Sequence, residues 1–473
     1  MVATGPRLGR PDGLTHLKGR HMPKTATLRI GAGSSFADDR IAPAADLAAR
    51  GAIDYLVFEC LAERTVAREN QTRRKDPSKG YTPRMLDRLE AVLPACLRND
   101  VKTVSNMGAA NPIGAAELAR AHARDCGLGD IHCAVVTGDD VSERLRGQPQ
   151  LRLMESGEPL ESLLPAMVSA NAYLGADAVC RAIATGARLV LTGRVADPSL
   201  FLAPAMHHFG WSYDDLQRLA AGTAAGHLLE CCAQVSGGCF GDRLGGKDVP
   251  DLARLGFPFA DIDAEGGVVI GKLDGTGGRV DVATCTEQLL YEIHDPADYI
   301  TPDCVLDITA LDLFSAGSDR VRMTGARARP RTPTYKVTVG YDDGYIGEGQ
   351  ISYAGEHALD RARWAAEVVQ QRLADRGLSY RETRIDYIGM SSLHGMGSGR
   401  VEPYEVRLRI AMRCDCRKAA EAVGFETRAL HVNGPGGGGG GADPVVKEVL
   451  AVQSVLIPRE QVDPQVRITE LRS

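Results

Sequence analysis

The chain has 473 residues and a hydrophobic content of 44%, enough to build either two domains or one large, elaborated α/β domain. Its 55 basic and 61 acidic side chains give a formal net charge of -6, which argues against nucleic acid as a partner. The apolar runs are shorter than the about 20 residues that a membrane span needs, and no signal-type apolar region follows the N-terminal basic residues. Twelve cysteines without paired C-x-x-C knuckles indicate reduced thiols, so we expect a cytoplasmic protein.

The N-terminal residues 1–24 are polar and mildly basic, and Met22 stands just before the first good strand. We expect this stretch to be a disordered leader or an over-extended gene start. Five apolar, β-branched runs then alternate with helix-length segments, at 28–33, 55–61, 101–108, 131–139 and 187–193. This rhythm predicts a mostly parallel sheet with Rossmann-like βαβ units. Ligands bind at the C-terminal ends of such strands, so the loops that follow them are candidate sites.

The loop after the first strand reads GAGSSFADDR. Backbone N–H groups freed by its glycines, with Ser34 and Ser35, suit a phosphate or carboxylate at a helix start. A plain turn with helix caps explains the same residues equally well. The motif lacks the G-x-G-x-x-G pattern and the lysine of a P-loop, so no dinucleotide fingerprint is present.

Two further polar residues follow neighbouring strands of the expected sheet. Glu59 stands in FECLAE and Asn106 in SNMGAANP. A buried amide beside a carboxyl group is suited to orient a substrate, but asparagine also adopts turn conformations easily. Ligand contact and a turn role are both open for Asn106.

The stretch LTGRVADPSLFLAP leads from a strand into a helix. Asp197 and Pro198 are explained as the cap and first turn of that helix. Arg194 is not explained in this way, because a guanidinium at a strand end beside a helix N-terminus suits an anionic ligand. The alternative is that Arg194 pairs with Asp197 or with another buried acid.

The segment GHLLECCAQVSGGCFGD contains two acidic residues close to glycines. We expect Glu230 and Asp242 to act as an acid/base pair or as ligands of a hard metal ion. Adjacent cysteines on a helix diverge by about 100°, so Cys231 and Cys232 are a poor metal site. The cofactor is therefore unknown, and a divalent metal is compatible with this pattern.

The residue pattern changes in the second half of the chain. Residues 212–330 read as helix and turn, extending a first domain over 25–330. A smaller α+β domain is expected over 334–473. Its predicted elements are strands 335–341, 345–353, 383–389, 403–413 and 427–432 and helices 357–375 and 416–424. The glycine-rich loop 434–441 should avoid regular structure, as a mobile linker or as a flap over a ligand.

Several long phrases resemble one known family, the acyclic terpene utilisation proteins called AtuA, formerly a domain of unknown function. They are IGAGSSFADDRI, YLVFECLAERT, LTGRVADPSLFLAPAMHHFGW, AAGTAAGHLLECCAQVSGG and GTGGRVDVATCTEQLLYEIHDPADYITPD. The resemblance runs in order from about residue 27 to 345. It implies a bacterial catabolic setting beside acyl-CoA carboxylases, hydratases and dehydrogenases, and it carries no set of catalytic residues. Some relatives have a small accompanying domain, which leaves room for a small protein partner.

From these observations we expect an enzyme acting on a small carboxylate or its CoA thioester, by hydration, dehydration or a related lyase step. The hypothetical site has Arg194 as anion anchor, Glu230 and Asp242 as acid/base groups, and Asn106, Ser34, Ser35 and Glu59 as substrate contacts. A homo-oligomer is expected. The competing class is a non-catalytic scaffold or subunit that binds a metabolite and a partner protein. Hydride transfer is a distant third, because the dinucleotide fingerprint is missing.

Overall fold

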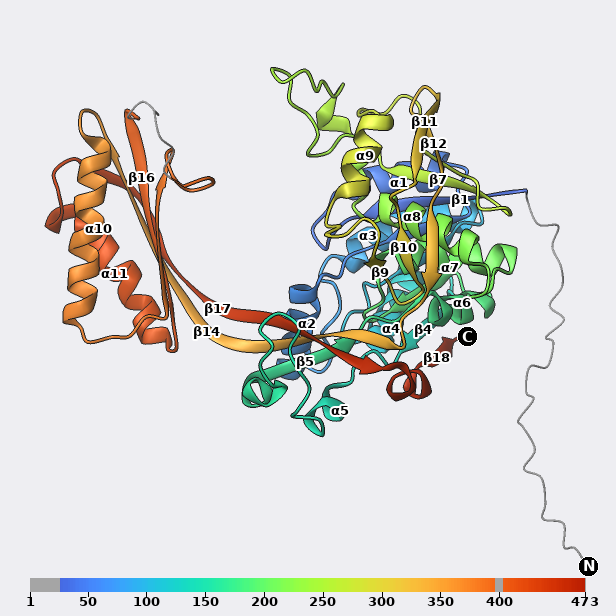
Figure 1. The fold of residues 1–473 in the computed structure, drawn as a ribbon, viewed down its shortest axis with the longest axis horizontal. Coiled ribbons are helices and arrows are strands. Elements are labelled where there is room, and N and C mark those ends of the chain that lie inside the picture. The colour runs from blue at the N-terminus through green and yellow to red at the C-terminus, as the bar shows by residue number, and fades with distance from the viewer. Residues whose placement is uncertain (1–25, 396–402, 473) are drawn as a thin grey trace, which may run out of the picture.

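The computed structural model describes residues 26–395 and 403–472. The expected leader, residues 1–24, lies outside this range. The described residues form a large body joined by a two-stranded ribbon to a smaller distal unit (Figure 1). No helix in the described ranges is long and apolar enough to cross a membrane.

A mixed sheet, ten strands wide over the described residues, forms the centre of the large body. Its parallel strands, in spatial order, are β1 (Thr27–Ser34), β2 (Tyr55–Phe58), β3 (Lys102–Ser105), β6 (Leu189–Thr192) and β4 (Cys133–Thr137). These are the five strands predicted in the first half. Antiparallel strands extend both edges, so the sheet is only partly parallel, and the expected Rossmann-like units stay a prediction.

The antiparallel strands beside β1 come from the region predicted as helix and turn. In spatial order they are β7 (Pro258–Asp263), β8 (Val268–Lys272), β12 (Arg320–Thr324) and β11 (Asp312–Gly317). A separate small sheet contains β9 (Tyr299–Ile300), β10 (Cys304–Asp307) and β13 (Arg327–Pro330). The prediction of helix and turn for 212–330 holds for α8 (Leu216–Glu230) and α9 (Val282–Leu290) but misses these strands, because their order comes from pairing, of β7 with β1 and of each further strand with its neighbour. The strands β7, β8, β12 and β11 of this segment extend the central sheet, and the assignment of the segment to the first domain stays a prediction.

The helices of the large body pack in two groups against the parallel strands. One group contains α1 (Ala42–Arg50), α3 (Met85–Arg98) and α4 (Pro112–Asp125), and the other contains α6 (Ala176–Ala184), α7 (Asp197–Phe209), α8 (Leu216–Glu230) and α9 (Val282–Leu290). The short helix α5 (Ser142–Arg146) follows β4, and α2 (Glu63–Lys75) follows β2 and lies beside β5 (Met167–Ala172). Buried aliphatic side chains of strands and helices form one continuous core.

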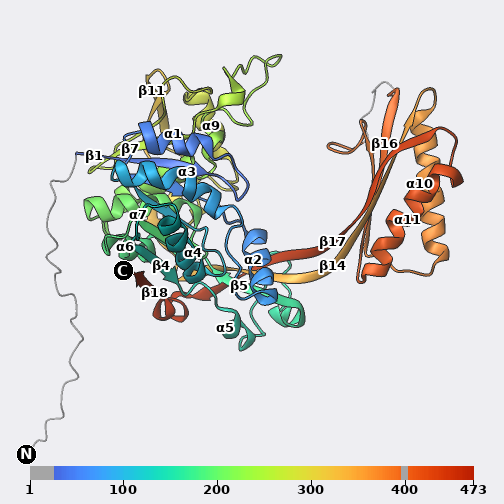
Figure 2. The same cartoon turned by 180° about the vertical axis from the view of Figure 1, so that it is seen from behind.

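Two 21-residue strands, β14 (Thr334–Ala354) and β17 (Gly438–Pro458), pair antiparallel and form the ribbon to the distal unit (Figures 1 and 2). The prediction of two strands with a break near 342 is wrong, because β14 continues through that point with only a register shift against β17. In the distal unit, β14 pairs with β16 (Glu405–Cys414), which pairs with β15 (Glu382–Ile388). Helices α10 (Ala358–Asp375) and α11 (Arg417–Asn433) pack on this sheet and enclose a second core.

Two predictions for the distal unit are corrected by the structure. Residues 427–432 lie inside α11 and not in a strand, because their buried positions Thr427 and Leu430 continue the apolar face of the helix. The glycine run is not a loop throughout, since Gly438 and Gly439 pair with Tyr353 and Ser352 of β14. The neighbouring strand supplies the hydrogen bonds that make an extended conformation favourable for glycine.

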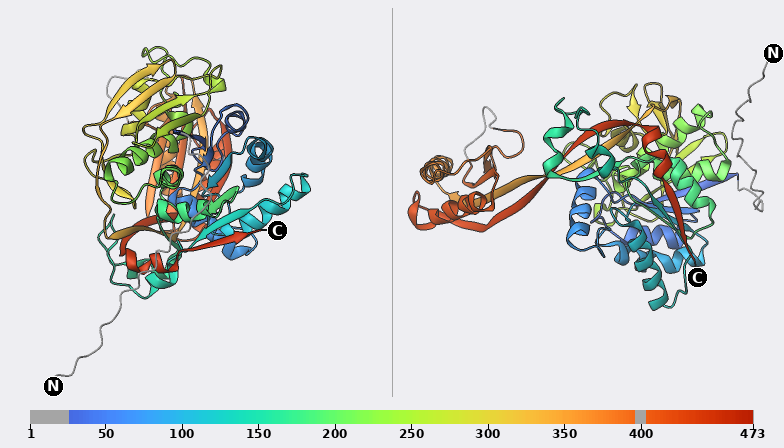
Figure 3. Two further views of the ribbon diagram at one scale, coloured as in Figure 1. Left: turned by 90° about the vertical axis from the view of Figure 1, so that its right-hand side faces the viewer. Right: turned by 90° about the horizontal axis from the view of Figure 1, so that it is seen from below.

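The chain ends on the large body and not in the distal unit. Strand β18 (Arg467–Leu471) pairs antiparallel with β4 and forms one edge of the central sheet (Figure 3). The first half of β14 also pairs with β5 of the large body. The division into 25–330 and 334–473 stays a prediction, and the structure shows that parts of both segments share one sheet.

Candidate functional site

Polar residues gather where the parallel strands end. Ser34 is the last residue of β1, Glu59 and Asn106 follow β2 and β3, and Arg194 follows β6. Two cavities adjoin this edge of the sheet. One, of about 320 Å³, is lined by Glu59, Glu63, Asp197, Glu230 and Glu292 among others, and we call it the carboxylate cavity.

The second cavity, of about 310 Å³, shares the three acidic residues Glu63, Asp197 and Glu292 with the first. Apolar and aromatic side chains form most of its other walls, and we call it the aromatic cavity. They include Met154, Tyr173, Pro198, Tyr299, Ile300, Tyr335 and Leu456. A ligand with a polar reacting end and a hydrocarbon chain would match this pair of adjoining spaces.

Glu59 is a buried carboxyl group held in one orientation. Its Oε1 accepts hydrogen bonds from the Leu61 backbone N–H at 2.7 Å and from Asn106 Nδ2 at 3.0 Å. Burial, helped by the nearby charge of Asp197, raises the pKa of Glu59 to about 8. Glu59 is therefore mainly neutral at pH 7, and its proton belongs on Oε2, the oxygen that those two donors leave free.

Arg194 is almost completely buried, with 2% of its surface exposed. Its guanidinium forms an ion pair with Asp197 at 3.0 Å, donates to the Leu61 carbonyl, and stacks on the Tyr173 ring at 4.1 Å from its centroid. Its backbone N–H donates to Asp139 at 2.9 Å. Of the two alternatives drawn from the sequence, the structure shows the pairing with Asp197, so the positive charge of Arg194 is already compensated.

Two acidic residues beside Arg194 differ in their environment. Burial opposes ionisation of Glu63, but Arg194 and a hydrogen bond from the Tyr173 hydroxyl outweigh it and lower the pKa of Glu63 to about 2. Burial raises the pKa of Asp197, although about a third of this side chain remains exposed at the cavities. Glu63 is therefore ionised at neutral pH, whereas burial disfavours the charged form of its neighbour Asp197.

Glu230 forms a close pair with His227 at the end of α8. His227 Nδ1 lies 2.6 Å from Glu230 Oε1, and its Nε2 lies 3.2 Å from the Leu289 carbonyl, which can only accept a hydrogen bond. The Nε2 atom must then carry a hydrogen, and the second proton is shared between Nδ1 and Glu230. Burial raises the pKa of Glu230 to about 7 against the opposing effect of His227, so this pair can take up or release a proton near neutral pH.

Other residues predicted from the sequence have different roles. Ser34 is fully buried, donates to the Glu59 carbonyl at 2.6 Å and lines neither cavity. Ser35 reaches the carboxylate cavity, but its N–H and hydroxyl both donate to Asp39, at 2.9 and 3.1 Å. Helix α1 begins only at Ala42, so the glycine turn is not at a helix start. The serines thus act as turn and strand contacts in this structure.

Asp242 is not brought together with Glu230. It lies in an exposed loop, where its carboxylate accepts from the Gly245 backbone N–H at 2.9 Å, and it lines neither cavity. Asn106 is fully buried and contacts Glu59 and the Cys60 backbone, so it positions the carboxyl group and does not face the cavities. The partner of Glu230 is its own helix neighbour His227.

Sequence reasoning missed several residues that surround the cavities. Asp197 was assigned to a helix cap, but the cap position is Ala196, and the Asp197 carboxylate turns toward Arg194. Glu63 lies four residues after Glu59, in a loop already marked as a candidate, and this spacing was an available signal. Tyr173 comes from a distant segment without a recognisable motif, and Glu292 lies in a phrase that carries the family resemblance but no assigned site residue.

The described residues contain no group of three histidine, cysteine or acidic side chains arranged to hold a metal ion. The chemistry that this arrangement offers directly is proton transfer. Glu59 can donate a proton, and Glu230, which pairs with His227, can accept one, within the same cavity.

Comparison with known families gives one match. The model described as acyclic terpene utilisation family protein AtuA matches residues 28–468, nearly the whole chain. It confirms the family resemblance drawn from the sequence and extends it through the distal unit to the last strand. No curated protein and no solved structure gives a significant match.

Proposed function

Because the chain belongs to the acyclic terpene utilisation family AtuA, we propose that it is an enzyme that adds water to, or removes water from, a branched acyclic thioester. One observation carries this proposal: a neutral Glu59 and a titratable Glu230, which pairs with the buried His227, line the same cavity. Hydration and dehydration need a positioned acid and a positioned base, each with a pKa near the working pH.

In the direction of dehydration, the ionised form of Glu230 removes the proton on the carbon beside the thioester carbonyl, and His227 stabilises the charge of that pair. The electron pair of the broken C–H bond forms the C=C bond, and the C–O bond to the hydroxyl group breaks. Glu59 donates its proton to the departing hydroxyl, which leaves as water. Glu230 then releases the substrate-derived proton to solvent and Glu59 takes one up from solvent, so both groups regain their starting forms and the step is balanced.

The environment favours a neutral reacting group over a free carboxylate. Glu63 and Asp197 line both cavities, and the positive charge of Arg194 is already shared between them. Lys336 likewise faces Glu63, so a free carboxylate would have to compete with Glu63 and Asp197 for the same two cations. A thioester carbonyl is uncharged, and it fits this position better than the small carboxylate that the sequence also allowed.

The aromatic cavity supports a hydrocarbon chain as the remainder of the substrate. Its walls bring Met154, Tyr173, Tyr299 and Leu456 beside the shared carboxylates. Apolar walls with a few fixed polar groups are typical of small-molecule sites. This agrees with the acyclic terpene catabolism from which the family takes its name.

The test is to assay the purified protein with branched unsaturated and 3-hydroxy acyl-CoA thioesters, following the conjugated C=C absorbance in both directions. We expect Glu59→Gln and Glu230→Gln to lower kcat by about 100-fold or more, since each removes an acid/base group. Glu69→Gln is the matched control, because Glu69 is also a buried glutamate with a raised pKa and lines neither cavity. Unchanged turnover in both site variants would contradict the assignment.

A second candidate, a scaffold or subunit role, is favoured by the distal unit. Trp364 of α10 and Phe425 of α11 are 59% and 61% exposed, so both helices of the distal unit present aromatic surface that a partner protein could cover. Light scattering of the purified chain, alone and with the proteins encoded beside it, tests this candidate. A stable complex whose separated parts are inert would favour the subunit role, and full activity of the isolated chain would exclude it.

A further inference from the structure

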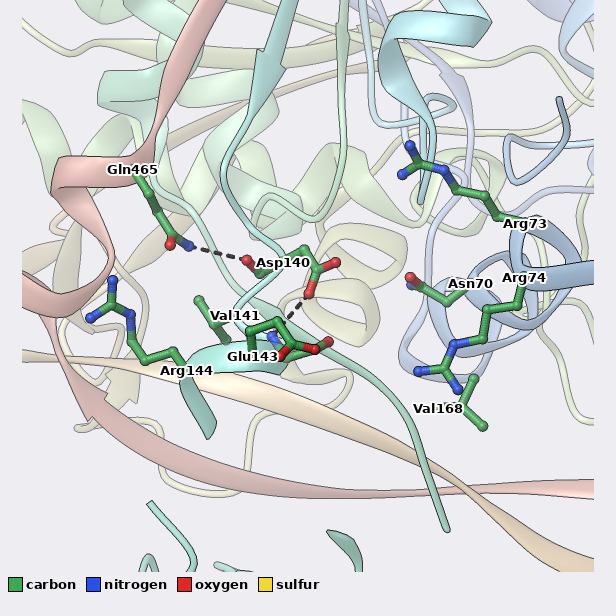
Figure 4. Close-up of a pocket in the computed structure, with 10 residues that line it drawn as sticks. Asn70, Arg73, Arg74, Asp140, Val141, Glu143, Arg144, Val168 and Gln465 are labelled. Carbon is green, nitrogen blue, oxygen red and sulfur yellow. Dashed lines mark hydrogen bonds between the residues drawn. The ribbon is translucent and has the colours of Figure 1, made fainter. Parts of the chain in front are cut away.

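A third cavity, of about 730 Å³, lies apart from the two already described. Arg73 and Arg74, on the last turns of α2, border it on one side, and Arg144 and Gln465 lie across from them (Figure 4). Val168 of β5 forms part of its wall. We call this space the arginine cavity.

The arginines of this cavity are not neutralised by the chain. Arg73, Arg74 and Arg144 are exposed, and in the described part of the chain none of them lies within 4.0 Å of a carboxylate oxygen, whereas Arg194 and Arg409 do. Two acidic residues also line the cavity. Glu143 pairs with Arg146 at 3.6 Å, and Asp140 accepts a hydrogen bond from the Ser142 backbone N–H at 2.9 Å.

The arginines keep free donors. Arg73 donates to the Ala110 carbonyl, and Arg74 reaches the Met167 carbonyl only at 3.4 Å. A guanidinium carries five N–H groups, so these contacts leave most of them available. Guanidinium groups in a fork arrangement match the oxygens of a phosphate group, with which they form paired hydrogen bonds.

We propose that the arginine cavity binds the phosphate groups of an organic phosphate. The volume of about 730 Å³ exceeds what inorganic phosphate needs and falls in the range of sites for larger ligands. The proposal deepens the proposed function, on which its preferred source of phosphate rests: a CoA thioester carries its phosphates at the end opposite to the acyl group.

The position of the cavity agrees with that source. Glu63 of the carboxylate cavity begins α2, and Asn70 and Arg74 of the arginine cavity follow it by seven and eleven residues. These spacings place all three on one face of the helix, with Arg74 about 17 Å along the axis from Glu63. In an extended CoA thioester, the phosphates and the thioester group are a comparable distance apart, so one ligand would span both cavities.

Hydrogen bonds also connect the two regions. Asn70 Nδ2 donates to Asn171 at 3.2 Å, Asn171 Nδ2 donates to Asp139 at 2.8 Å, and Asp139 accepts from the Arg194 backbone N–H. If the phosphate ligand is a molecule separate from the substrate, its binding would act through these hydrogen bonds on the turn that holds Arg194. The arginine cavity would bind the phosphates of a CoA thioester and those of a separate ligand by the same hydrogen bonds. Kinetic measurements distinguish the two sources.

The direct test is calorimetric titration of the whole chain with inorganic pyrophosphate and with adenosine 3′,5′-bisphosphate at fixed ionic strength. We expect saturable binding that Arg73→Gln/Arg74→Gln weakens about tenfold or more, since charged hydrogen bonds are lost. The matched control is Arg64→Gln/Arg68→Gln, which removes the same charge from positions of the same helix that are equally classed as exposed but do not line the cavity. Circular dichroism and thermal unfolding of each variant establish that it is folded.

Absence of saturable binding to the wild-type chain would overturn the proposal, and so would an equal loss in the control variant, because binding would then reflect general surface charge. These readouts need no turnover, so they hold even if the proposed reaction is wrong. Where turnover is measurable, adenosine 3′,5′-bisphosphate that raises the KM of a thioester indicates the substrate's own phosphates. A change in kcat without competition indicates a separate phosphate ligand, and both results support the site.

Discussion

At the scale of single residues, the function depends on one carboxyl group that stays protonated at neutral pH. Glu59 is 7% exposed, and two N–H groups bind one of its oxygens while the other is left for a proton. Moving the Glu59 carboxylate from water into the protein is costly, and the two hydrogen bonds together do not offset this cost. The neutral form of Glu59 is therefore favoured. The same atoms that fix its orientation therefore leave it able to donate.

The raised pKa of Glu59 predicts a specific dependence of stability on pH. The folded chain keeps this proton up to about pH 8, whereas the unfolded chain loses it near 4.5, so the stabilising contribution is present below pH 4.5 and is lost as pH rises toward 8. We expect Glu59→Gln to lose less unfolding free energy than the wild type between pH 5 and pH 8, by on the order of 2 kcal/mol or more. Urea denaturation at several pH values measures this.

Glu63 supplies the contrasting case. Its pKa of about 2 lies below the ordinary value, so its contribution is present above pH 4.5 and is lost as pH falls toward 2. Glu63→Gln should therefore flatten the acid side of the stability profile and leave the range from pH 5 to pH 8 unchanged. Identical profiles for the two variants would show that the environments of Glu59 and Glu63 are wrongly assigned.

The two site groups also predict the pH profile of turnover. Glu230 must be ionised to act as base, with a pKa of about 7, and Glu59 must be protonated to act as acid, with a pKa of about 8. The profile of kcat/KM in the dehydration direction should be bell-shaped, with limbs near these values. Glu59→Gln should remove the alkaline limb from the residual activity. A profile flat between pH 5 and pH 9 would rule out this pair.

At the scale of elements, glycines allow β14 to lie against α11. A Cβ atom at Gly347 would be 2.0 Å from the Ala420 carbonyl oxygen, which is backbone and cannot move aside cheaply. At Gly439 of β17, in the same sheet, an added Cβ would meet nothing within 4 Å. The close approach of strand and helix thus depends on particular glycines and not on the glycine-rich composition as such.

These two glycines form a matched pair for a stability test. Gly347→Ala should lower the free energy of unfolding by about 2 kcal/mol, because α11 must shift away from the sheet. Gly439→Ala should change it by less than about 0.5 kcal/mol. Chemical denaturation of both variants measures the difference, and equal effects would mean that the contact of β14 with α11 is looser than the structure shows.

At the scale of the whole molecule, the large body should fold without the distal unit. The distal core is separate, and the connection is the ribbon of β14 and β17 (Figure 1). Asp342 pairs with Leu450 across this ribbon, so a two-residue Asn-Gly turn can close the gap left by removing residues 343–449.

We expect this shortened chain to remain soluble, because β18 still covers the β4 edge of the central sheet and β5 still pairs with β14. Circular dichroism and size-exclusion chromatography check the outcome. An insoluble or unfolded product would show that the distal unit is needed for the large body to fold.

Much of the central fold was predictable from local patterns. The five parallel strands are short apolar runs followed by turn residues, and α4 begins where Asn111 precedes Pro112, with the Asn111 side chain accepting from the Gly114 N–H. The antiparallel strands β7 and β8 were not predicted, because their order comes from the pairing of β7 with β1 and of β8 with β7. Strand propensity depends on such neighbours more than helix propensity does.

The sequence by itself determined the family, the parallel strands and the chain of polar residues after them, because each is encoded within a short stretch. It also marked Glu59, Glu230 and Arg194 as candidates. Only the tertiary structure decided what these residues do. The pairing of Arg194 with Asp197 and the separation of Asp242 from Glu230 depend on packing and solvent exposure. Those are properties of the assembled strand ends, and no short stretch of the chain carries them.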